Sequence, residues 1–128
     1  MRALVIFIVA AFACLANAQT VEQVRAELHR QGVPHPDIVL AQARLETGNF
    51  TSDLCKKKGN LFGMKSGKRY TQYHHWRESV ADYKRRISSR YQGGDYYEFL
   101  RLINYAEDKL YFRKIKNIIK TSKPWQTK

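Results

Sequence analysis

Residues 36–50 read PDIVLAQARLETGNF, and this stretch predicts a short apolar helix that ends on a carboxylate. Pro36 and Asp37 suit the first turn of a helix. One face at helical spacing consists of Ile38, Ala41, Gln42 and Leu45. Gly48 is expected to end the helix, which leaves Glu46 in its last turn. There the carbonyl end of the helix dipole disfavours a negative charge and so favours the protonated carboxyl.

A carboxyl that stays neutral near pH 7 is what general-acid attack on a glycosidic bond requires. The stretch therefore raises the hypothesis that Glu46 is the acid of a glycosidase. From these residues alone, a solvated glutamate at a helix end is the simpler interpretation, and the segments downstream decide between the two.

Residues 1–18 predict a secretory signal peptide. Arg2 precedes an apolar run over residues 3–16, and Ala-Asn-Ala at 16–18 offers a cleavage site. The run is too short for a comfortable membrane span. A lipoprotein signal acylated at Cys14 is the less favoured alternative, because the residues before that cysteine match the usual small-residue box poorly. We therefore expect an exported protein of the periplasm, cell envelope or extracellular space, with no transmembrane segment in its mature chain.

The mature chain, residues 19–128, suits one domain with a single compact core. Its one cysteine is Cys55, so no intramolecular disulfide can support that core. Removal of Arg2 with the signal leaves 22 Lys and Arg against 11 Asp and Glu, a formal charge of +11. This charge points to a polyanionic partner, such as an acidic wall polymer or an anionic membrane surface. Export makes nucleic acid the partner we least expect.

The rest of the chain is predicted to be mainly helical, with one small β-hairpin. Thr20 with Gln23, and Asp95 with Glu98, have the spacing of capping boxes. Further helices are expected at residues 20–31, 52–58, 76–92, 95–103 and 108–120. Two short polar and aromatic runs around Ser66 predict a hairpin of about a dozen residues.

Four segments, in this order along the chain, carry a resemblance to a known family. They are AQARLETGNF (41–50), NLFGMK (60–65), WRESVADY (76–83) and NYAEDKLY (104–111). Together they resemble the peptidoglycan β-N-acetylglucosaminidases of glycoside hydrolase family 73, over nearly all of the mature chain. The resemblance implies a lysozyme-like helical domain, a hairpin lobe, and a groove between them that takes a glycan strand.

The resemblance also implies roles for individual residues. Glu46 aligns with the catalytic acid of the family, and Tyr105 falls where the family usually has a functional tyrosine near the acid. A glycan groove combines aromatic platforms with hydrogen-bonding side chains. The substrate-binding residues predicted on this basis are Phe50, Asn60, Phe62, Tyr70 and Tyr73. Gln72 and Trp76 belong to the same mixture, although Phe62 and Trp76 suit equally well a core that holds the hairpin to the following helix.

A second catalytic carboxylate is missing from its expected place. Some members of the family carry one in the hairpin lobe, but residues 54–77 contain no Asp or Glu. The nearest acids are Asp53, Glu78, which suits a helix start, and Asp82, which suits a helix surface or a buried pair. The remaining route is substrate assistance, in which the 2-acetamido group of the sugar attacks its own anomeric carbon.

No metal or cofactor is expected. His74 and His75 lack a carboxylate or thiol at ligand spacing, so a solvated or capping role is favoured for them. The leading hypothesis is an exported, monomeric hydrolase that cleaves the β-1,4 bond after N-acetylglucosamine in peptidoglycan glycan strands, with Glu46 as its single general acid. A lytic transglycosylase on the same scaffold and a non-catalytic wall-binding protein are the alternatives.

Overall fold

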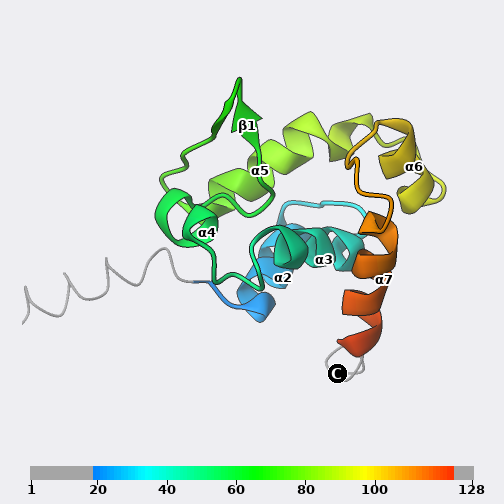
Figure 1. The fold of residues 1–128 in the computed structure, drawn as a ribbon, viewed down its shortest axis with the longest axis horizontal. Helices are drawn as coiled ribbons and strands as arrows, with labels where there is room; N and C mark the ends of the chain where they lie inside the picture. Colours follow the sequence, from blue (N-terminus) through cyan, green and yellow to red (C-terminus); the bar gives the residue numbers. More distant parts are fainter. Residues whose placement is uncertain (1–18, 123–128) are drawn as a thin grey trace, which may run out of the picture.

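The computed structural model describes residues 19–122 (Figure 1). The predicted signal peptide, the alternative acylation site Cys14 and the tail after Ser122 lie outside the described residues. No helix among residues 19–122 is long and apolar enough to cross a membrane.

The described residues form six α-helices, one 3-10 helix and one two-stranded antiparallel sheet, so the prediction of a mainly helical fold with a small hairpin is confirmed. In Figure 1, α4 and the hairpin lie at one end of the molecule, and α6 and α7 lie at the other. In chain order the elements are α2 (Val21–Arg30), α3 (Pro36–Glu46), α4 (Asp53–Lys58), β1 (Lys65–Ser66), β2 (Arg69–Tyr70), α5 (Trp76–Arg86), η1 (Ser88–Arg90), α6 (Tyr96–Leu102) and α7 (Tyr111–Thr121).

Helix α3 runs through the core and contacts both α2 and α7. Its residues Val39, Leu40 and Ala43 belong to the main hydrophobic cluster, whereas Ala41 packs with Tyr111 and other residues of α7 in a second cluster. The single apolar face predicted for this helix was therefore too narrow. An amphipathic pattern is weak in a helix that is covered on two sides.

Local capping signals set most helix ends. Thr20 and Gln23 form the predicted capping box of α2. Asp95 caps α6 by accepting from the backbone N–H groups of Tyr97 and Glu98, but the Glu98 carboxylate pairs with Arg101. The reciprocal half of the second predicted box was therefore wrong. The Glu98 carboxylate pairs with Arg101 one turn along the helix, and therefore does not bond back to the N–H of Asp95 as a capping box requires.

The helix that starts at Trp76 ends earlier than predicted. Helix α5 stops at Arg86, and the 3-10 turn η1 replaces its last part. The hydroxyls of Ser88 and Ser89 donate to carbonyl groups four residues earlier, which are backbone bonds that compete with regular helix. At its start, His75 caps the helix because its Nδ1 accepts from the N–H of Arg77. The predicted capping role of a histidine here is confirmed.

The hairpin is held at its base and on its flank. Lys65 pairs with Tyr70 and Ser66 with Arg69. The Asn60 side chain donates to the carbonyl oxygens of Met64 (2.8 Å) and Thr71 (3.1 Å) and accepts from the Met64 N–H (3.0 Å). These three bonds join the two ends of the hairpin through one side chain.

Candidate active site

Glu46, the last residue of α3, lies at a groove of about 370 Å³. The groove forms where the end of α3, the segment before the hairpin, the end of α5 and the loop after α6 meet. Its walls are made by Glu46, Phe62, Gly63, Met64, Lys65, Arg86, Ile87, Arg90, Ile103, Asn104 and Tyr105. Glu46 is the sole carboxylate among these lining residues.

The Glu46 carboxyl is open to the groove on one side and crowded on the other. The residue is exposed, yet burial of its carboxyl by neighbouring atoms raises its pKa. Within residues 19–122 it makes no hydrogen bond and no ion pair. A carboxyl with these properties keeps its proton to a higher pH than an ordinary glutamic acid and has it free to donate.

Gly63 lies against this carboxyl. Its φ is +68°, and a Cβ atom at this position would be 3.3 Å from Oε2 of Glu46 and 3.9 Å from Cε1 of Tyr70. Position 63 therefore favours glycine for two reasons: the backbone is left-handed, and little room is left for a Cβ atom beside the Glu46 carboxyl. Tyr70 is 46% exposed and lies on the hairpin, with the Lys65 ammonium 5.0 Å from its ring centroid. The rim beside Glu46 thus carries one of the predicted aromatic platforms.

Tyr105 lines the same groove from the loop after α6. Burial raises the pKa of its hydroxyl well above the ordinary value, and neighbouring Tyr111 and the negative charge of Glu46 act in the same direction. Tyr105 is therefore a neutral hydroxyl that can donate a hydrogen bond. The structure brings together the two residues that the resemblance assigned to catalysis.

A buried hydrogen-bond network supports Glu46 from one turn below. The Gln42 side chain is fully buried; its Oε1 accepts from the Tyr83 hydroxyl (2.6 Å) and its Nε2 donates to the Tyr111 hydroxyl (3.1 Å). The hydroxyls of Tyr83 and Tyr96 lie 2.8 Å apart. Because these tyrosines come from α5, α6 and α7, three helices fix the end of α3 from which Glu46 projects.

Phe62 also lines the groove, but it is only 4% exposed and its ring centroid lies 4.5 Å from that of Tyr83. It therefore belongs to the core and presents an edge to the groove. Trp76 is 1% exposed, in agreement with the core alternative for that residue.

Two predicted substrate contacts need correction, and a third lies outside the groove. Phe50 is buried in the main cluster because its N–H bonds to the Thr47 hydroxyl and its backbone turns inward at φ +67°. Asn60 is fully buried and uses its amide to hold the hairpin. Neither side chain faces the groove. Tyr73 is largely buried and lines an adjoining cavity, where its hydroxyl donates to Asp82.

Asp82 is a half-buried pairing residue, close to one of the two roles predicted for it. It contacts Arg85, and its Oδ2 lies 2.5 Å from the Tyr73 hydroxyl and 3.3 Å from Nη1 of Arg86. Burial acts to raise the pKa of Asp82, but the hydrogen bonds from Tyr73, Arg86 and Arg85 together lower it. Asp82 is therefore ionised and paired, and it is absent from the residues that line the Glu46 groove.

The groove also contains three cations that the sequence did not mark as site residues: Lys65, Arg86 and Arg90. On a helix surface such residues resemble ordinary solvated charges. Asp82 and Arg86 lie four residues apart on one helix, a spacing that favours an ion pair. This spacing could have predicted that Arg86 is held in place.

Comparison with known proteins identifies the family of this chain. The family model described as glucosaminidase, mannosyl-glycoprotein endo-beta-N-acetylglucosaminidase, matches residues 21–124 and so includes every element of the fold. Searches of curated proteins and of solved structures returned no match. The family model confirms the resemblance, and the family implies a glycan substrate. The chain therefore belongs to the glucosaminidases of glycoside hydrolase family 73, which are endo-β-N-acetylglucosaminidases.

Proposed function

We propose that this protein is an exported peptidoglycan hydrolase that cleaves the β-1,4 bond after N-acetylglucosamine, with Glu46 as its general acid. One observation carries the proposal: among the residues that line the groove, Glu46 is the sole carboxylate, it has a raised pKa, and it is not held in an ion pair. The formal charge of +12 favours an anionic polymer such as the bacterial wall.

The absence of a second lining carboxylate supports a substrate-assisted route. Protonated Glu46 donates its proton to the bridging oxygen as the bond to the anomeric carbon breaks. The carbonyl oxygen of the 2-acetamido group forms the new bond to that carbon and gives a cyclic oxazolinium ion. Water then opens this ring and gives one proton to the Glu46 carboxylate. The products are a reducing N-acetylglucosamine end of retained configuration and a free hydroxyl on the next sugar.

Tyr105 acts in this scheme as a positioning residue. Its hydroxyl is neutral and lines the same groove as Glu46. A neutral hydroxyl donor can hold the acetamide in the orientation that attack requires, and correct orientation accounts for a large part of enzymatic rate enhancement.

The surroundings of the groove support cleavage within a strand. Lys65 and Arg86 are shared with a cavity beside the hairpin, and Arg90 and Ile103 are shared with a cavity beside α6. The groove therefore adjoins a hollow on each of these two sides, so the substrate has room to extend beyond the bond that is cut.

The test is digestion of purified sacculi by the parent and by Glu46→Gln, with Glu107→Gln as the matched control because Glu107 is exposed and does not line the groove. We expect the parent and the control to release fragments with reducing N-acetylglucosamine ends. Glu46→Gln should lower the rate by about 10²- to 10⁴-fold. Clearing by Glu46→Gln at the parental rate would contradict the assignment.

The same digest separates the alternatives. A lytic transglycosylase, which also works with a single acid, would leave 1,6-anhydromuramic ends, and these are identified by mass spectrometry. A non-catalytic wall-binding protein would release no fragments while still sedimenting with sacculi. A product of inverted anomeric configuration, observed by proton NMR directly after cleavage, would exclude the acetamide route while leaving Glu46 as the acid.

A further inference from the structure

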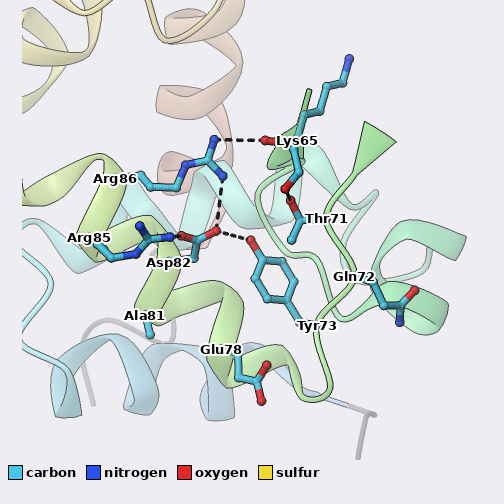
Figure 2. Close-up of a pocket in the computed structure, with 10 residues that line it drawn as sticks. Lys65, Thr71, Gln72, Tyr73, Glu78, Ala81, Asp82, Arg85 and Arg86 are labelled. Carbon is cyan, nitrogen blue, oxygen red and sulfur yellow. Dashed lines mark hydrogen bonds and ion pairs between the residues drawn. The ribbon is translucent and has the colours of Figure 1, made fainter. Parts of the chain in front are cut away.

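A second cavity, of about 730 Å³, lies between the hairpin and α5 (Figure 2). It adjoins the Glu46 groove because Lys65 and Arg86 line both. Its volume falls within the range of about 300–1,000 Å³ that is usual for sites that bind small molecules. Neither the proposed acid nor the acetamide route uses this cavity, so it is available for another part of the substrate.

The cavity is preformed by contacts across its two walls. The Tyr73 hydroxyl donates to Asp82 of α5, and Nη2 of Arg86 donates to the carbonyl oxygen of Lys65 (3.1 Å). Gln72 donates to the carbonyl of Lys57 (2.9 Å). These bonds, of which Figure 2 draws the first two, hold the hairpin and the segment after it to α5 and α4. A site that is ordered before binding avoids part of the entropy cost of binding.

The charges in the cavity are separated. Figure 2 shows Arg86 and the backbone of Lys65 at one end and Glu78 at the other, with Arg85 along the α5 wall, whereas the Lys65 side chain points away from the cavity. Asp82 is neutralised by its arginine pairs, but the Arg85 side chain is 76% exposed and retains free donors. Among the residues that the structure describes, the Glu78 carboxylate accepts one bond, from the His74 N–H at 3.3 Å. The cavity thus offers cations next to the catalytic groove and a carboxylate away from it.

We propose that this cavity binds the stem peptide of the muramic acid residue that follows the bond to be cut, an inference that rests on the proposed function. The stem branches from that sugar. It carries a free carboxylate on its second residue and, further out, an amine on the diamino acid at its third. This order of charges matches the order in the cavity, where Arg86 and Arg85 face the carboxylate and Glu78 faces the amine. The enzyme then prefers glycan that bears peptides.

The experiment compares initial rates on two substrates prepared from the same sacculi: solubilised strands that keep their stem peptides, and strands freed of them by an amidase. The measured quantity is the ratio of the two rates for the parent, Arg85→Gln and Glu78→Gln. Glutamine at position 78 can still accept from His74, so the helix start is kept. Lys120→Gln is the matched control, because Lys120 is exposed on α7, far along the chain from the cavity.

We expect the parent and Lys120→Gln to cleave peptide-bearing strands faster than denuded strands. Arg85→Gln and Glu78→Gln should each lower the ratio by about three- to fivefold, as for a partly exposed ion pair. Equal rates of the parent on both substrates, or an unchanged ratio in both variants, would overturn the inference while the hydrolase remains. In that case the cavity serves the glycan or the structure alone. If the parent cleaves neither the peptide-bearing nor the denuded strands, the proposed function is overturned, and the inference with it.

Discussion

Replacing Gly63 with alanine should lower the rate of glycan cleavage by about three- to tenfold without unfolding the protein. The new Cβ would lie 3.3 Å from Oε2 of Glu46, which is closer than an ordinary contact. Either the carboxyl or the segment before the hairpin must then move by a few tenths of an ångström. A displacement of about 1 Å costs about 10²-fold in rate, which sets the expected scale for this smaller shift.

Gly67→Ala is the matched control. Gly67 has φ +65°, nearly the same as Gly63 at +68°, but nothing lies within 4 Å of the Cβ position. Both substitutions place alanine in the left-handed region and should cost about 1–2 kcal/mol of stability each. In a domain of this size that lowers Tm by about 3–8 °C. The difference in activity between the two variants therefore isolates the contact with Glu46.

The assay is kcat/KM for release of reducing ends from solubilised glycan, measured as a function of pH at a temperature where both variants stay folded. Gly63→Ala also removes water from the carboxyl, so the basic limb of its profile should move to higher pH than that of Gly67→Ala. Equal activities and superimposable pH profiles for the two variants would refute a working carboxyl beside Gly63.

Three further predictions follow from the same contacts. Because burial raises the pKa of Glu46, the basic limb of kcat/KM for the parent should lie above the ordinary glutamic acid value of about 4.3; a limb at or below that value would count against Glu46 as the acid. Because the pKa of Glu46 is higher in the folded state, the folded state binds more protons than the unfolded state once the pH exceeds the unfolded-state pKa, and the free energy of unfolding falls as the pH rises from there through the folded-state pKa. Glu46→Gln should therefore have a higher Tm than the parent at pH 7 but an equal one below about pH 3. Thr47→Val should cost about 1–3 kcal/mol in denaturant unfolding, because the buried N–H of Phe50 loses its acceptor at 2.9 Å; an unchanged midpoint would show that this N–H has another partner.

The helices could be predicted largely because their signals are local. Thr20 with Gln23 begins α2 and Ser52 begins α4, each through a side chain that accepts from a nearby N–H. The predicted helix bounds are wrong where a polar side chain bonds to nearby backbone, because the pattern of apolar residues does not reveal such bonds. Helix α7 begins at Tyr111 and not at Asp108, because the Asp108 carboxylate accepts from the Leu110 N–H and forms a turn before the helix.

In the candidate site, the position of Glu46 was predicted correctly, but the directions of several other side chains were not. The location of Glu46 at a helix end depends on a short run of sequence, and it was found. The direction of an aromatic or amide side chain depends on the whole fold. Phe50 and Asn60 have the composition of a sugar-binding groove, but a positive φ at the first and three hydrogen bonds at the second turn them inward. The cations Lys65 and Arg86 reach the groove through contacts between distant segments, which spacing alone does not reveal.

The amide of Gln42 has a consequence for how this domain comes apart. It is the point at which hydroxyls from α5 and α7 meet α3, and the Tyr83 hydroxyl extends the junction to α6. Loosening any one of these helices leaves a buried polar group without its partner, so opening of a single helix is disfavoured. Backbone amides of α3, α5 and α7 should then exchange with deuterium together, and a partly opened molecule that still holds Glu46 in place should not accumulate.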